Sequence, residues 1–333
     1  MVETIESLDF ELEIGQGHGR EYPVNVLESP AGQAQGTLHF PFSQQLLERH
    51  LEELQVAQLH PAGSRGEEPS GQEPAAQNFG RMLFDALFAD EVGILYDSSR
   101  HQAAEQGKVL RLKVRIEAPE LANLPWEFLY DSHLGEYVCL SHATPLARYV
   151  EHPEPTQPRA VTPPPRSLGI VAAPRGSTLA ALERDKGCLE EASQHLQSLE
   201  LVAVEWVEGG TWSDLQQAFE CKDWHAVHYV GEGGLDTGEG FVVLADGDDD
   251  GQSDRLSATR LSRLLASRTS LQLVWLSPAQ GARDDGRDRF SSTATHLVQQ
   301  GIPAVLTMQY GLSERVTEAF IEAFYAALAA SMP

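Results

Sequence analysis

The stretch HAVHYVGEGG, residues 225–234, decides the fold class of this chain. It begins as a short apolar run of strand-forming residues and ends abruptly in glycines. In an α/β sheet, such a strand delivers its last residues to the carboxyl edge, where sites are usually built. Glu232 is held at this end between Gly231 and Gly233, which would let the backbone turn sharply and expose the carboxylate. We therefore expect the functional site to be organised around Glu232.

Strands and helices alternate around this stretch from Ser167 to the end of the chain. Besides 225–230, strands are expected at 168–172, 201–207, 271–276 and 304–308, with a short hairpin arm at 241–244. Helices are expected at 182–199, 211–219, 258–266, 292–299 and 313–330. Thr211 and Asp214 have the spacing of a helix capping box. This alternation predicts an α/β fold with a mostly parallel sheet and helices on both faces.

The first part of the chain reads as a smaller mixed α/β domain. Alternating apolar and polar residues at 8–14 and 22–27 predict a hairpin or a pair of edge strands, and 109–116 predicts a further strand. Helices are expected at 43–54 and near 79–88. Residues 60–77 are rich in Pro, Gly, Ser and Glu, so they are expected to form a mobile loop.

Two further features concern the end of this domain. Glu127 and Arg148 lie among core-type residues, so they are read either as a buried or interfacial ion pair or as two surface charges. Prolines are dense between His152 and Arg166, which predicts a stiff connector. We expect an N-terminal region at 1–152, a connector at 153–166 and a second domain at 167–333.

Composition narrows the range of functions. The formal net charge of the 333 residues is -25, so the field of the protein repels nucleic acid and anionic lipid. No apolar run has the length of a membrane span, and a cytoplasmic protein is expected. Cys139, Cys188 and Cys221 are too scattered for a disulfide framework, and each is expected to be a small core residue.

Two loops should meet at the carboxyl edge of the predicted sheet, 231–234 and 277–282, because each directly follows an apolar strand. The motifs HYVGEGG, LQLVWLSPAQGA and FSSTATHLVQQGIPAVLTMQY, followed by a helix with AFYAAL, resemble the CHAT domain family of caspase- and separase-like cysteine peptidases of clan CD. The earlier segments LPWEFLYD and TPLARY fit the same family. The resemblance runs from about Pro23 to Leu328 and implies a caspase-like sheet.

The resemblance also implies which positions carry chemistry. In active members the two loops read H-x-x-G-H-G and N-[AS]-C-x-G-A, so the catalytic histidine corresponds to Glu232 and the nucleophilic cysteine to Ala279. Ser277 and Pro278 replace the residues that usually precede the cysteine. Alanine offers no nucleophile, and a carboxylate with an ordinary pKa of about 4.3 is a poor proton shuttle at neutral pH.

We therefore expect a pseudopeptidase that serves as a binding, scaffolding or regulatory module in bacterial signalling or defence. Its partner would be a protein such as an active protease, a sensor or a repeat protein. The remaining candidate interaction residues around the two degenerate positions are His228, Gly231, Gly233, Ser277, Gln280 and Gly281.

Alternatives remain open. The chain could be an active CHAT peptidase whose native cysteine and histidine have been replaced at Ala279 and Glu232, or a hydrolase that uses Glu232 with a second carboxylate. His228 is read as a hydrogen-bonded core residue, with proton transfer as the alternative. The sequence DGDDDG, 246–251, matches the first half of a calcium loop, but Ser257 stands where the bidentate Glu belongs. We expect a solvated turn there, and neither a metal nor a cofactor.

Overall fold

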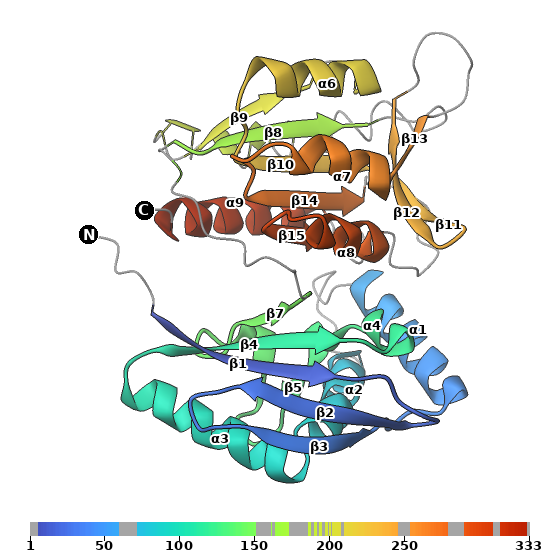
Figure 1. Cartoon of the computed structure of the whole chain (residues 1–333), viewed down its shortest axis with the longest axis vertical. Coiled ribbons are helices and arrows are strands. Elements are labelled where there is room, and N and C mark those ends of the chain that lie inside the picture. Colours follow the sequence, from blue (N-terminus) through green and yellow to red (C-terminus); the bar gives the residue numbers. More distant parts are fainter. Residues whose placement is uncertain are drawn as a thin grey trace, which may run out of the picture. The chain divides into compact units, whose positions relative to one another are not determined.

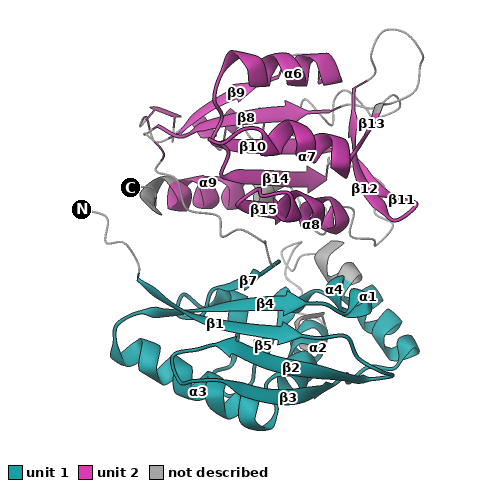
Figure 2. Ribbon diagram, in the orientation of Figure 1, with its two compact units in different colours: residues 1, 3–151 teal, residues 2, 152–333 magenta. Residues whose placement is uncertain are grey.

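The chain forms two compact units, residues 3–151 and 152–333 (Figure 2). The computed structural model describes residues 6–59, 72–150, 161, 164–172, 186–187, 190–191, 193–194, 197–198, 200, 202–207, 210–245, 254–278, 290–308 and 314–331. Among the helices of these residues, none combines the length and the apolar character needed to cross a membrane.

The first unit is built on a mixed five-stranded sheet with the order β3-β2-β1-β4-β7. Its strands are β1 (Ser7–Ile14), β2 (Glu21–Glu28), β3 (Ala34–His39), β4 (Val109–Ile116) and β7 (Leu146–Arg148). β2 pairs antiparallel with β1 and β3, whereas β4 pairs parallel with β1 and β7. The predicted hairpin and the predicted strand at 109–116 are confirmed.

Three helices accompany this sheet: α1 (Gln44–Leu59), α2 (Gln72–Leu87) and α3 (Asp90–Glu105). The smaller elements are α4 (Pro119–Ala122), η1 (Trp126–Phe128), β5 (Tyr130–Asp131), β6 (Glu136–Tyr137) and η2 (Val138–Leu140). The loop expected at 60–77 is wrong for 72–77, because α2 begins at Gln72 and Ala76 is buried in the core. Residues 60–71 lie outside the described residues.

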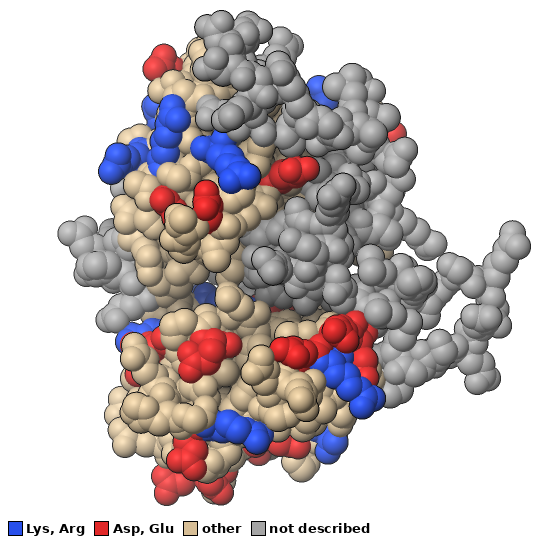
Figure 3. All heavy atoms as spheres, turned by 90° about the vertical axis from the view of Figure 1, so that its right-hand side faces the viewer, with Lys and Arg blue, Asp and Glu red and all other residues tan. Residues whose placement is uncertain are grey.

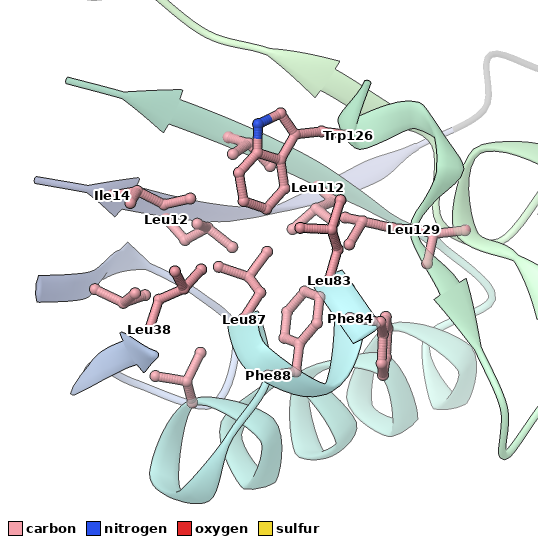
Figure 4. Packing of buried hydrophobic residues seen from close by; sticks show 14 of the residues in the cluster. Leu12, Ile14, Leu38, Leu83, Phe84, Leu87, Phe88, Leu112, Trp126 and Leu129 are labelled. Carbon is pink, nitrogen blue, oxygen red and sulfur yellow. The ribbon is translucent and has the colours of Figure 1, made fainter. Parts of the chain in front are cut away.

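The two faces of this sheet differ in chemistry because side chains alternate along each strand. Leu12 and Ile14 of β1 and Leu112 of β4 are buried against Leu83 and Leu87 of α2 (Figure 4). The intervening residues carry charges that pair across β1 and β4. These pairs are Asp9 with Arg111 and Lys113, Glu11 with Lys113, and Glu13 with Arg115. One face therefore forms the core, and the other carries a ladder of ion pairs.

The predicted pair of Glu127 and Arg148 is formed. The guanidinium donates two hydrogen bonds to the carboxylate, at 2.9 and 2.8 Å. It also donates to the carbonyl oxygens of Ala122 and Leu124. The pair is not buried, because Glu127 is exposed, so the two charges lie at the surface and pair there. Arg148 ties β7 to the end of α4 and to the residues that follow it.

The second unit contains a five-stranded sheet with the order β15-β14-β10-β8-β9 (Figure 1). Its strands are β8 (Arg166–Val171), β9 (Ala203–Trp206), β10 (Ala226–Gly231), β14 (Leu273–Pro278) and β15 (Ala304–Thr307). Every neighbouring pair is parallel. The predicted parallel sheet is confirmed, and its strand β10 has all six residues buried.

Helices cover both faces of this parallel sheet, as predicted. The helices are α6 (Trp212–Cys221), α7 (Ala258–Ala266), α8 (Ser291–Gln299) and α9 (Glu314–Ser331). Alternate residues of β10, such as Tyr229, share one apolar cluster with α6, α7 and α8. Val230 lies in a second cluster with Trp275 of β14 and Ile321 of α9. Of the helix expected at 182–199, only some residues are described, and those are helical.

A small antiparallel sheet follows β10, with the order β11-β12-β13. Its strands are β11 (Gly233–Asp236), β12 (Glu239–Leu244) and β13 (Asp254–Ser257). The hairpin arm expected at 241–244 is confirmed as part of β12. The capping box is also confirmed, since the Thr211 amide donates to Asp214 and the Asp214 amide donates to the Thr211 hydroxyl. On the face shown in Figure 3, both signs of charge occur in each unit.

Candidate functional site

The candidate site lies where β10 and β14 end side by side. Gly231, the last residue of β10, is in register with Pro278, the last residue of β14. Positions 232 and 279 therefore follow neighbouring strands at the same carboxyl edge, as the sequence predicts. Of the predicted site residues, His228, Gly231, Glu232, Gly233 and Ser277 are described, whereas Ala279, Gln280 and Gly281 lie outside the described residues.

The glycines beside Glu232 are needed for close packing. A Cβ atom at Gly231 would lie 2.3 Å from the hydroxyl oxygen of Tyr229, and one at Gly233 would lie 2.3 Å from the ring of Phe290. Neither glycine is among the residues with positive φ. The expectation that they permit a sharp turn is therefore wrong, because the constraint comes from two aromatic side chains that occupy the space of a Cβ.

Tyr229 holds the backbone of Glu232 in place. Its hydroxyl oxygen lies 2.8 Å from the carbonyl oxygen of Glu232 and 2.6 Å from that of Val243, and it accepts a hydrogen bond from the Val243 amide at 3.2 Å. The same amide lies 2.8 Å from the Glu232 carbonyl oxygen. Burial strongly raises the pKa of the phenol, which therefore stays protonated and can donate. The path of the chain at the site is thus set by a residue within β10.

Glu232 itself is half-buried at the junction between β10 and β11. Its carbonyl oxygen accepts hydrogen bonds from the Tyr229 hydroxyl and the Val243 amide, contacts that we call the backbone clamp. Within the described part of the chain, its carboxylate enters no ion pair with Lys, Arg or His. A half-buried carboxylate without a cationic neighbour attracts positive charge. The site therefore presents an acid at the position where the strand ends.

The family of the chain follows from its match to a family model. The model of the CHAT domain matches residues 74–333, most of the chain, including β10, β14 and the candidate site. The chain belongs to the CHAT domain family. The match begins later than the resemblance expected from about Pro23, so β1, β2 and β3 lie outside the matched residues. No curated protein matches the chain.

In this CHAT domain, His228 lies in the body of β10 and faces α9. Its Nε2 atom is 3.3 Å from the hydroxyl oxygen of Ser277, and its Nδ1 atom is 3.5 Å from that of Tyr325. The Tyr325 hydroxyl continues to Ser167 at 3.1 Å. The imidazole also stacks on Trp275, with ring centroids 4.1 Å apart. His228 and Ser277 are therefore brought together, but within β10 and β14 and not in the loops that follow these strands.

The protonation of His228 fits a structural role. Desolvation by complete burial lowers the pKa of its imidazole to about 3. The ring is thus neutral at physiological pH, with one nitrogen that donates and one that accepts a hydrogen bond. Such a ring is a weak base, so the reading of His228 as a hydrogen-bonded core residue is the one that the geometry supports.

The cysteines do not complete a catalytic site among the described residues. Cys139 and Cys221 are exposed, which contradicts the expectation that they are core residues; in η2 and α6 the neighbours Val138 and Phe219 take the buried positions. Cys221 precedes β10, whereas Glu232 follows it. The strand separates them by roughly 16 Å or more, at about 3.3 Å per residue. Cys188 is outside the described residues.

Metal binding has no support in the described residues, where no group of three or more His, Cys, Asp or Glu side chains is placed to hold an ion. The sequence DGDDDG, 246–251, lies outside the described residues, so the solvated turn expected there stays a prediction. Ser257, at the twelfth position of the supposed calcium loop, instead caps α7: its hydroxyl accepts a hydrogen bond from the Arg260 amide.

The residues that sequence reasoning missed are the aromatic ones that shape the site. Tyr229, Trp275 and Tyr325 are expected from the sequence only as apolar positions of strands or helices, and Phe290 lies outside the expected elements. The repeated glycines at 231, 233 and 234 were the available signal, because a glycine that is not needed for a turn often marks close approach by another group.

We expect Gly231→Ala to destabilise the second unit by about 1–3 kcal/mol, the usual range for overpacking. The new methyl group would displace the Tyr229 hydroxyl, which is fixed by Glu232 and Val243. Chemical denaturation measures this loss. Gly187→Ala is the matched control, because nothing lies within 4 Å of a Cβ there. Equal stability of the two variants would show that the clamp is not rigid.

Proposed function

We propose that this CHAT domain is not a cysteine peptidase and acts as a protein-binding or regulatory module. One observation supports the proposal most directly. β10 and β14 end in register, and the residues that follow them are Glu232 and Ala279. The two positions to which the family resemblance assigns the histidine and the cysteine thus follow neighbouring strands directly, and they carry neither residue.

The surroundings support the same proposal. Cysteine peptidase chemistry needs a thiolate and a neighbouring imidazole. Cys221 lies before β10, at the opposite end of that strand from Glu232, and Cys139 belongs to the other unit. The imidazole of His228 is buried and weakly basic. A fold that retains the strand ends and their backbone clamp without these groups can still present a shaped surface to another protein. The expected setting in bacterial signalling or defence rests on the resemblance and stays a prediction.

Incubation with arginine and lysine peptide substrates tests the proposal. We expect no cleavage by the purified chain, because Ala279 has no nucleophilic atom. Mass spectrometry of the peptides detects cleavage, and turnover that survives removal of contaminating proteases would contradict the proposal.

The alternative of an inactivated peptidase is tested by the double substitution Glu232→His with Ala279→Cys. If the chain were a recently inactivated enzyme, the double variant would cleave these peptides and either single variant would not. We expect all three variants to be inactive, because Ser277 and Pro278 also depart from the active pattern.

A further inference from the structure

The strand that follows Glu232, β11, has one edge with which no other described strand pairs. β11 pairs with β12 on one side and is the outer strand of the small sheet. Figure 1 shows it at the periphery of its unit. An outer strand presents backbone N–H and C=O groups that can pair with another chain.

The alternation of hydrogen-bonded pairs between β11 and β12 identifies which backbone groups of β11 face away from β12. The Val243 amide donates to the Glu232 carbonyl, so Glu232 and Val243 form a hydrogen-bonded pair. In an antiparallel ladder such pairs alternate with non-hydrogen-bonded ones. Gly233 and Leu235 therefore direct their N–H and C=O groups away from β12. No hydrogen bond within the described residues uses these outward groups.

β11 is short, but it has no lysine, proline or bulge at this edge. Native proteins commonly block an edge strand with a lysine, a proline or a bulge. β11 has the sequence GGLD, and its pairing with β12 is regular over all four residues. The rings of Phe290 and Phe241 pack against the faces of the two glycines, and Leu235 is 62% exposed. The edge is thus open to a second strand and offers an apolar side chain beside it.

The charges near the edge of β11 indicate which kind of partner strand could pair with it. Asp236 is paired with Arg255 at 3.6 Å, whereas no cation of the described residues pairs with Glu232. A second copy of the chain would bring together two molecules with a formal charge of -25 each, which opposes self-association. A segment with Lys or Arg residues would instead place its charge near Glu232.

We propose that the free edge of β11 binds an extended, basic and apolar peptide segment of a partner protein, which adds as a further strand beside Glu232. Backbone groups of Gly233 and Leu235 bind the segment, the Leu235 side chain contacts an apolar residue, and Glu232 attracts a cationic one. This proposal rests on the proposed binding function and assigns it to one edge.

Leu235→Pro is the decisive variant. Proline removes the outward N–H and hinders the approach of another strand. It costs no hydrogen bond to β12, because that N–H faces away from the sheet. Leu235→Ala is the matched control, since it shortens the side chain and keeps the amide. Gly233→Pro is unsuitable because Phe290 occupies the space needed by its side chain.

The probe is a fluorescein-labelled hexapeptide of alternating valine and arginine, and its counterpart has glutamate in place of arginine. Fluorescence anisotropy should show that the acidic peptide binds at least about tenfold more weakly than the basic one. Leu235→Pro should weaken binding of the basic peptide by about tenfold or more, and Leu235→Ala by less than about threefold. Glu232→Gln should weaken it by about threefold and reduce its salt dependence.

Hydrogen exchange of the wild-type chain gives a second measurement that does not depend on a variant. The amides of Gly233 and Leu235 should exchange more slowly when the basic peptide is bound. Undiminished binding to Leu235→Pro, unchanged exchange at these amides, or no binding at about 1 mM peptide would each overturn the proposal.

Mass spectrometry of the same samples separates this proposal from the proposed function. A basic peptide that binds at β11 and is cleaved would contradict the absence of peptidase activity and leave the edge assignment standing. An intact peptide that does not bind would overturn the edge assignment and leave the absence of peptidase activity standing.

Discussion

Replacement of Trp275 by alanine should lower the free energy of unfolding of the second unit by about 3–5 kcal/mol, the range for truncating a large buried aromatic residue. Trp275 is 1% exposed in the middle of the parallel sheet. It stacks on His228 and contacts the rings of Phe320, Phe324 and Tyr325 in α9. The substitution would remove the contact that joins β10, β14 and α9, so a cavity would remain between them.

Urea unfolding followed by circular dichroism measures this effect. Trp212→Ala is the matched control, because Trp212 is only partly buried and its ring is covered by Arg260; we expect a loss of about 1 kcal/mol there. Trp275→Phe should cost less than Trp275→Ala, because the indole nitrogen is buried without a hydrogen-bond partner in the described residues. Similar losses for Trp275→Ala and Trp212→Ala would contradict a central role for Trp275.

Acidification should destabilise the second unit through His228. The pKa of its imidazole is about 3 in the folded unit, because of desolvation, and about 6.5 in an unfolded chain. The unfolded state therefore binds a proton that the folded state does not bind between these two pKa values. The stabilisation is complete above about pH 6.5 and falls as the pH drops towards about 3. Between about pH 6.5 and 4.5 the loss should reach about 2–3 kcal/mol.

The measurement is the urea midpoint by tryptophan fluorescence, which reports mainly on the second unit, where four of the five tryptophans lie. His228→Gln cannot titrate, so its stability should fall less over this pH range than that of the wild type. His101→Gln, on the exposed surface of α3, should retain the wild-type dependence. A His228→Gln variant with the wild-type pH dependence would show that other groups cause the loss.

Local patterns allowed the elements with a clear period to be predicted. The strand at Val109–Ile116 and the helix at Ala258–Ala266 have the expected bounds, since their apolar residues recur with the periods of a strand and a helix. The capping box of Thr211 and Asp214 was predictable because it depends on residues only three positions apart. β10 and β14 followed from the same patterns, and Glu232 was placed correctly after β10. Their ends were wrong, because β10 continues to Gly231 and β14 continues to Pro278, beyond the expected ends at 230 and 276.

Elements whose apolar residues recur with only a weak period were not predicted from the sequence. The buried side of α3 consists of Val92, Tyr96, Ser99 and Ala103, so its stripe includes small and polar residues. Among the described side chains of β13, Leu256 is the buried one, and the strand pairs with β12. In both cases tertiary contacts decide the structure, and they leave little trace in a short window of sequence.

The glycines of the candidate site show the same limit of prediction from the sequence. Sequence alone does not separate a glycine that turns from one that makes room, because the difference depends on distant residues. Gly233 is packed against Phe290, which lies far along the chain, and Gly231 against a side chain that folds back from Tyr229. The position of Glu232 was therefore predictable, but the reason for its flanking residues was not.

The hydroxyl of Tyr229 has a consequence for how such a site evolves. It fixes the backbone at position 232 through a carbonyl group, and that contact does not depend on which side chain the position carries. Drift at this position can therefore exchange one functional group for another while the scaffold stays intact. The backbone geometry at this position is thus maintained separately from the functional group that the position carries.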